Sequence, residues 1–250
     1  MSLMLVVISL IAGLLIGAIG IGGVLLVPGL TYVVGIDVHE AIPACMLSFL
    51  PTGIIALAIY AKHGSIRWHL VGWLCLGAVP FAYLGSVVLP FIPPDLVMTL
   101  IATLMMVTGI DALRKSLRQS SPDSQGSIPG PLPFVIIGAI TGFGSAISGT
   151  GGPLILVPIL IYLGLPVLVS VGLSQAIQIP IAAFASLGNW AGGNLNLELA
   201  FPISVCLVVG ALIGSIVIHR LPGEPIRKFV SGFIIVTGLA IGLRLIAGLI

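Results

Sequence analysis

Apolar residues run almost without interruption along the chain, in stretches close to the ~20 residues that a helix needs to cross a bilayer. Within each stretch the apolar positions are continuous rather than alternating, which indicates helices and argues against the strands of a β-barrel. We therefore expect an all-α polytopic membrane protein with about eight membrane-crossing helices plus broken or re-entrant half-helices. The predicted segments cover residues 3–20, 23–35, 41–61, 69–89, 95–113, 132–147, 152–163, 168–190, 199–218 and 226–249.

One polar stretch, residues 114–131, interrupts this pattern, and its Ser, Pro, Gly and charged residues indicate a linker. It separates a first transmembrane repeat (1–113) from a second one (132–250), because from Pro51 onward the two halves align at a steady offset of 129 residues. The aligned pairs are Pro51 with Pro180, Gly64 with Gly193, Gly85-Ser86 with Gly214-Ser215, Pro93 with Pro222, and Thr108-Gly109 with Thr237-Gly238.

The positions of the basic residues favour repeats of inverted topology. Residues 3–35 as one helix would be about 50 Å long, longer than the ~30 Å hydrocarbon core, so this segment must fold back or lie flat. If each half contains such a hairpin, the termini lie outside, the linker is cytoplasmic, and eight of the nine Lys and Arg residues are cytoplasmic. These eight are Lys62, Arg67, Arg114, Lys115, Arg118, Arg220, Arg227 and Lys228. With single crossings instead, the repeats are parallel and only six are cytoplasmic.

Two glycine-rich breaks, "GAIGIGGVLLVPGL" (17–30) and "GSAISGTGGPLILVPIL" (144–160), lie inside apolar segments. Interrupted helices in inverted repeats are typical of secondary transporters. A helix N-terminus has free N–H groups and a partial positive charge, so it binds an anion without Lys or Arg. We expect the two breaks to lie close together near the membrane midplane, each starting a half-helix whose N-terminus faces a shared cavity. The alternative is that the glycines only permit close helix packing.

Polar side chains near the second break add to the candidate site. Ser148 and Thr150 stand in N-cap position, where they could cap the half-helix or offer hydroxyls to an anion. Gln175 and Gln178 share a helix face, and their counterparts in the first repeat are apolar, which suits a substrate contact; interhelical hydrogen bonding is the alternative. The candidate substrate-binding residues are Gly20, Gly22, Gly23, Ser48, Ser148, Thr150, Gly151, Gly152, Ser174, Gln175 and Gln178.

Composition excludes several other classes of protein. Charged residues make up 6% of the 250 residues and the net charge is only +2, against about 25% charged residues in soluble domains, so neither a soluble fold nor a nucleic-acid partner is expected. No predicted segment carries a charged residue near its centre, which leaves proton coupling without an embedded acid; sodium coupling through backbone carbonyls stays open. No nucleophile–base pair, metal cluster or cofactor motif occurs, so we expect no enzyme activity and no cofactor.

The motifs "GIGGVLLVPGL" and "GTGGPLILVPIL", the helices with Pro51 and Pro180, and "HGSIRW" with "GGNLNL" resemble the sulfite exporter TauE/SafE family. This resemblance covers essentially the whole chain. It implies a multi-pass transporter of the bacterial inner membrane that carries sulfite, a sulfonate or another small organic or sulfur anion. The expected partners are this anionic substrate and the lipid bilayer, with a homodimer as an open alternative. An anion channel and a non-transporting membrane scaffold are the alternative functions.

Overall fold

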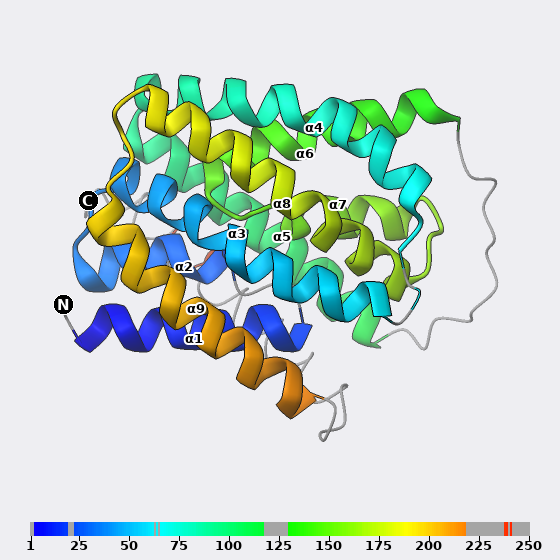
Figure 1. Cartoon of the computed structure of the whole chain (residues 1–250), viewed down its shortest axis with the longest axis horizontal. Helices are drawn as coiled ribbons and strands as arrows, with labels where there is room; N and C mark the ends of the chain where they lie inside the picture. Colours follow the sequence, from blue (N-terminus) through cyan, green and yellow to red (C-terminus); the bar gives the residue numbers. More distant parts are fainter. Residues whose placement is uncertain are drawn as a thin grey trace.

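The computed structural model describes residues 3–19, 23–62, 64, 66–117, 130–218, 238–239 and 241. This part of the chain is helical and contains no strand, as expected (Figure 1). The elements are α1 (Leu3–Ile19), α2 (Gly23–Gly29), a π-helix η1 (Leu30–Val34), α3 (Val38–Lys62), α4 (Trp68–Val88), a short 3-10 helix η2 (Leu89–Phe91), α5 (Pro94–Leu117), α6 (Pro131–Ser148), α7 (Pro153–Tyr162), α8 (Val167–Ala191) and α9 (Leu197–Ile218).

These helices match the apolar segments expected from the sequence, except that α3 begins at Val38 instead of residue 41 and α5 ends later than expected. Helix α5 continues to Leu117 instead of ending at residue 113, because Leu, Arg and Lys after that position are good helix formers. The expected segment 226–249 lies outside the described residues, apart from 238–239 and 241. In the described part, five helices are long and apolar enough to cross a membrane, and shorter apolar helices accompany them.

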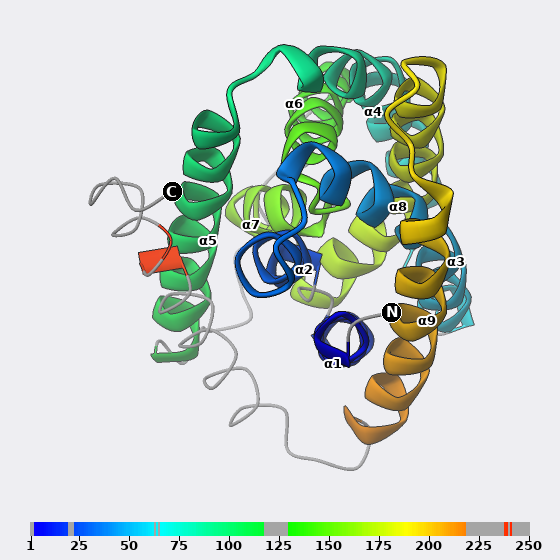
Figure 2. The same ribbon diagram turned by 90° about the vertical axis from the view of Figure 1, so that its left-hand side faces the viewer.

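The first glycine-rich break reverses the chain direction. A methyl group added at Gly29 in α2 would lie 2.7 Å from the side chain of Ile8 in α1, so α2 runs back along α1. The same relation holds in the second half, where a methyl group at Gly144 in α6 would lie 2.7 Å from Ile155 in α7. Both short helices lie in the interior, between α5 on one side and α3 and α8 on the other (Figure 2).

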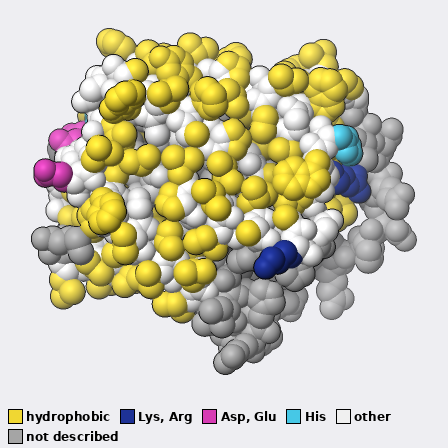
Figure 3. Space-filling view, viewed as in Figure 1, with side chains coloured by type: hydrophobic (Ala, Val, Ile, Leu, Met, Phe, Trp, Pro, Cys, Tyr) yellow, Lys and Arg dark blue, Asp and Glu magenta, His cyan; other side chains and the backbone are white. Residues whose placement is uncertain are grey.

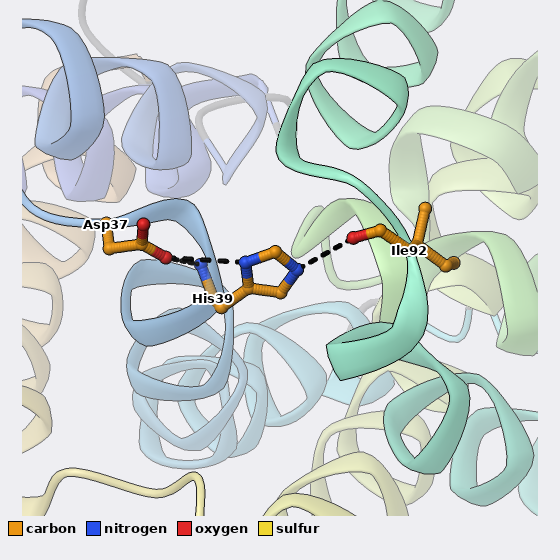
Figure 4. A network of polar contacts seen from close by, with 3 residues as sticks. All are labelled: Asp37, His39 and Ile92. Atoms are coloured by element: carbon orange, nitrogen blue, oxygen red, sulfur yellow. Dashed lines mark hydrogen bonds and ion pairs between the residues drawn. The ribbon is translucent and has the colours of Figure 1, made fainter.

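The long helices α3 and α8 are packed together in opposite directions. His39, at the start of α3, places Nε2 3.0 Å from the carbonyl oxygen of Ile92, just beyond α4, and Nδ1 3.4 Å from Asp37 (Figure 4). The start of α3 therefore lies beside the end of α4. Gly188, near the end of α8, packs against Ser86, which is also near the end of α4. The end of α8 thus lies at the same end of the molecule as the start of α3 (Figure 1).

Glycines bring two further helix pairs into close contact. A methyl group at Gly142 in α6 would overlap the carbonyl oxygen of Ala78 in α4. At Gly13 in α1 it would overlap the carbonyl oxygen of Leu207 in α9. The members of one pair lie 129 residues from their equivalents in the other. Small residues at these positions let the helix backbones approach closely, as is usual in membranes.

Charge divides the described molecule into two ends separated by an apolar surface (Figure 3). The acidic end, as we call it, carries acidic residues that begin α3, α5 and α9 or directly precede them: Asp37, Glu40, Asp95 and Glu198. Lys62 and Arg67, between α3 and α4, lie at the opposite, basic end. Large apolar side chains such as Leu132 and Phe201 are 67% and 73% exposed. A surface of this kind is suited to lipid and not to water.

Candidate substrate-binding site

The two glycine-rich breaks meet in the interior. A methyl group at Gly23, the first residue of α2, would lie 3.1 Å from the carbonyl oxygen of Thr150 in the second break. For the described residues, the expectation that the breaks lie close together is confirmed. Gly20 and Gly22 lie outside the described residues.

The ring of Phe49 in α3 lies against both breaks. A methyl group would lie 2.9 Å from this ring at Gly23 and 3.0 Å from it at Gly151. Phe49 is 1% exposed, so the ring is enclosed. An aromatic ring therefore adjoins both breaks at these glycines. The sequence could not reveal this, because Phe49 reaches the breaks from another helix.

Helix α7 begins differently from the expectation. Gly152 is its N-cap, with a φ of +112°, a conformation that only glycine adopts readily. The N–H groups of Ile155 and Leu156 donate to the carbonyl oxygen of Gly152, at 3.2 and 3.0 Å, and no side chain caps the helix. The N-cap role considered for Ser148 and Thr150 is therefore wrong.

Ser148 and Thr150 are instead bonded to their own surroundings. The Ser148 hydroxyl donates to the carbonyl oxygen of Gly144 at 2.7 Å, and its oxygen lies 2.9 Å from the hydroxyl oxygen of Thr150. Because each hydroxyl has one proton, the Thr150 proton must then point to Ser148. Neither hydroxyl has a proton left to donate to an anion in this arrangement.

Two polar side chains outside the candidate set, Thr141 through its methyl group and Ser145 through its hydroxyl, lie beside the start of α7. A methyl group at Gly152 would lie 3.9 Å from the Thr141 side chain and 4.0 Å from the Ser145 hydroxyl, both on α6. Both residues are 0% exposed, and neither hydroxyl has a hydrogen-bond partner in the described part of the chain. Other buried hydroxyls on helices, such as those of Ser48 and Thr52, donate to the carbonyl four residues earlier.

The sequence contains a pattern that could have identified these two residues. Thr141 and Ser145 are four residues apart, so they share a helix face directly before the break. Their counterparts at the 129-residue offset are Ala12 and Ile16. Thr141 and Ser145 are thus polar where the first half of the chain has apolar residues, as Gln175 and Gln178 of α8 are.

The two glutamines of α8 are buried near the middle of the helix. Gln175 is 1% exposed, and neither atom of its amide has a partner among the described residues. Gln178 is 2% exposed, and its Nε2 donates to the carbonyl oxygen of Phe49 at 3.4 Å. An unpartnered buried amide costs about 1–3 kcal/mol, so Gln175 is poorly explained as a packing residue.

The two other serines of the candidate set have partners within the helices. The Ser174 hydroxyl donates to the backbone carbonyl oxygen of Val171 at 2.8 Å. The Ser48 hydroxyl donates to the backbone carbonyl oxygen of Ala44 at 2.7 Å. It also lies 3.1 Å from the carbonyl oxygen of Ala200 in α9. Ser204 of α9 donates to Ser48 at 3.0 Å. Ser48 therefore joins α3 to α9, and nothing in its contacts points to a substrate.

Comparison with known proteins decides the family. The family model of the sulfite exporter TauE/SafE proteins matches residues 5–241. The chain belongs to this family. It is 24% identical to a probable membrane transporter protein of Methanocaldococcus jannaschii, over 94% of this chain and 93% of that protein. It is 25% identical to the probable membrane transporter protein YjnA of Bacillus subtilis, over 96% of this chain and 99% of that protein.

A further relative is the probable membrane transporter protein YdhB of Bacillus subtilis, 24% identical over 88% of this chain and 91% of that protein. No solved structure gives a significant match to the chain. This TauE/SafE chain is thus a multi-pass helical membrane protein of a transporter family, and the resemblance noted in its sequence is confirmed.

Proposed function

We propose that this TauE/SafE protein is a secondary transporter of a small anion, such as sulfite, a sulfonate or another small organic or sulfur anion. One observation carries the proposal. The hydroxyls of Thr141 and Ser145 are buried and lack partners among the described residues, and both side chains lie beside the start of α7, Ser145 with its hydroxyl and Thr141 with its methyl group. Each offers one proton, and an oxyanion with several acceptor oxygens can take both.

The surroundings of this site favour negative charge without a buried cation. The N-terminus of α7 carries a partial positive charge, and α2 with η1, a continuous apolar helical segment from Gly23 to Val34, begins at the same place. The Gln175 amide supplies two further N–H protons in the interior. Hydrogen bonds to a charged group contribute about 1.5–3 kcal/mol each, so a few such donors suffice to bind an anion.

The arrangement of the helices supports inverted repeats and, with them, alternating access. Helices α3 and α8 have equal lengths of 25 residues and begin 129 residues apart, and they run in opposite directions. The close contacts of α4 with α6 recur, at the same offset, between α9 and α1. In this proposal the two halves rock against one another around the site, which is reached from each side of the membrane in turn.

The charges at the two ends support an orientation in a bacterial inner membrane. Lys and Arg concentrate in cytoplasmic loops, so the basic end with Lys62 and Arg67 faces the cytoplasm. The acidic end with the start of α1 then faces outward. The direction in which the anion moves is a separate property that orientation does not set.

Transport by the purified protein in proteoliposomes tests this function. A transporter gives saturable uptake of labelled anion and counterflow against unlabelled anion, whereas a channel gives no counterflow. Sulfite, sulfate, thiosulfate, taurine, sulfoacetate and acetate form the first panel. A true ligand also raises thermal stability by RT ln(1 + [L]/Kd). A scaffold shows neither transport nor a ligand-dependent shift, and this result would overturn the proposal.

A further inference from the structure

Helix α8 carries a second group of buried polar side chains, closer to its end. Ser186 is 5% exposed and Asn189 is 0% exposed. In the described part of the chain, neither the Ser186 hydroxyl nor either atom of the Asn189 amide has a hydrogen-bond partner. Groups buried in this way are unfavourable by about 1–3 kcal/mol each. They are better accommodated in a state in which water or a ligand reaches them.

These two residues continue the polar face that contains the central glutamines. Ser186 follows Gln175, and Asn189 follows Gln178, by about three helical turns, so each pair points in nearly the same direction. The small side chains of Ala182 and Ala185, both 0% exposed, lie between them on this side of α8. The face extends over about 20 Å from Gln175 to Asn189, from the middle of the molecule toward the acidic end.

The first half of the chain does not repeat this feature. The counterparts of Ser186 and Asn189 at the 129-residue offset are Leu57 and Tyr60 of α3. If the polar pair served only to hold the helix pairs together, the equivalent helix would need it as well. The asymmetry is the same one that distinguishes Gln175 and Gln178 from Met46 and Phe49.

Both polar residues are buried in the present conformation, beside a close contact between α8 and α4. Gly188 lies between the two polar residues, and a methyl group there would overlap the Ser86 hydroxyl of α4 and lie 3.1 Å from the carbonyl oxygen of Tyr83. Helices α4 and α8 therefore touch here through backbone and small side chains. At about 100° per residue, Gly188 points about 100° away from Asn189 and about 160° away from Ser186, so the α4 contact borders the polar face and does not cover it.

We propose that Ser186 and Asn189 form a second anion station on the transport path, between the central site and the acidic end. This inference rests on the proposed transport function. An anion leaving Thr141, Ser145 and the glutamines toward the acidic end meets the Ser186 hydroxyl and the Asn189 amide next. Both are neutral hydrogen-bond donors, so they hold the anion weakly enough for release. The station is buried in this conformation and becomes accessible when the protein opens toward the acidic end.

Thiol labelling tests the station. Cys45, Cys75 and Cys206 are replaced by Ala, and Ser186→Cys and Asn189→Cys are introduced one at a time. Each variant is reconstituted and treated from the acidic side with two membrane-impermeant thiosulfonate reagents of similar size, one anionic and one cationic. Ala191→Cys, exposed at the end of α8, provides the reference rate for each reagent. Leu187→Cys and Phe184→Cys, which are 46% and 39% exposed on the apolar surface, are the lipid-facing controls.

We expect both station cysteines to react, and to react several-fold faster with the anionic than with the cationic reagent after normalisation to Ala191→Cys. The lipid-facing controls should react with neither. Labelling no faster than at Leu187→Cys, or without preference for the anionic reagent, would overturn the station. Sulfate and taurine counterflow by each variant in the same vesicles shows that it is folded. Counterflow without labelling refutes the station alone, whereas loss of counterflow in the unlabelled parent protein refutes the transport function.

Discussion

The Nε2 amide of Gln178 donates to the backbone carbonyl of Phe49 at 3.4 Å, and the two residues are 129 positions apart. They occupy the same position in α8 and α3, two helices of 25 residues that begin 129 residues apart. Under the proposed inverted symmetry, a residue that contacts its own counterpart lies beside the axis relating the halves. The Phe49 ring packs on both glycine-rich breaks, so this contact sits where two moving halves would meet.

Replacing both glutamines by Leu should impair anion transport while leaving the protein folded. Leu at position 175 removes a buried amide that has no partner among the described residues, so stability should stay the same or rise by up to about 1–3 kcal/mol. The measurements are counterflow and thermal melting in detergent. Reduced transport at normal stability supports a substrate contact, and unchanged transport would assign both residues to helix packing.

Thr141→Val and Ser145→Ala should each weaken anion binding about tenfold to a hundredfold, because each removes one hydrogen bond of about 1.5–3 kcal/mol to a charged group. Neither hydroxyl has a partner among the described residues, so the melting temperature without ligand should not fall. Thr103→Val and Ser170→Ala are matched controls, since these hydroxyls donate to carbonyls of their own helices. The readout is the ligand-induced thermal shift, and an equal loss in the controls would contradict the assignment.

Gly152→Val should abolish transport. Valine strains the backbone at a φ of +112°, at a cost of about 1–3 kcal/mol, and places methyl groups beside Thr141 and Ser145. Gly193→Val is the control for strain, because Gly193 has a φ of +71° with open space around it. If Gly193→Val loses transport to the same degree at equal membrane abundance, strain alone explains the effect.

Phe49→Ala should change which anions are carried. The ring packs on both breaks, and its removal opens space beside the proposed site. We expect larger sulfonates to be accepted better relative to sulfite, together with a loss of stability of about 3–5 kcal/mol. Phe49→Leu keeps most of the volume and limits this loss. A selectivity unchanged in both variants would show that the ring does not border the anion.

Cysteines at Ser2 and Ser121 test the topology, which the sequence alone predicts because both positions lie outside the described residues. The inverted arrangement places Ser2 outside and Ser121 in the cytoplasm. An impermeant maleimide applied to intact cells should label Ser2→Cys only. Labelling of both from the same side would exclude the inverted model.

The sequence by itself determined the helices, the reversals and the family. Apolar runs of membrane length leave the backbone no alternative to internal hydrogen bonding, so helices form where the runs lie; the segment expected over 168–190 is α8, Val167–Ala191. The length of residues 3–35 required a fold-back, and glycines of positive φ mark the second reversal. Gln175 and Gln178 are candidates because their counterparts in the first half, Met46 and Phe49, are apolar. Both glutamines are buried in the structure.

Only the tertiary structure decided which polar groups have partners. Ser148 is bonded to Gly144 and Thr150, and Ser48 to α9. The hydroxyls of Thr141 and Ser145 have no partner among the described residues. Sequence spacing tells which face of a helix a side chain occupies, but a hydroxyl's partner depends on atoms brought from distant segments by packing. The Phe49 ring reached the breaks for the same reason: α3 packs across them, and no local pattern of residues encodes that contact.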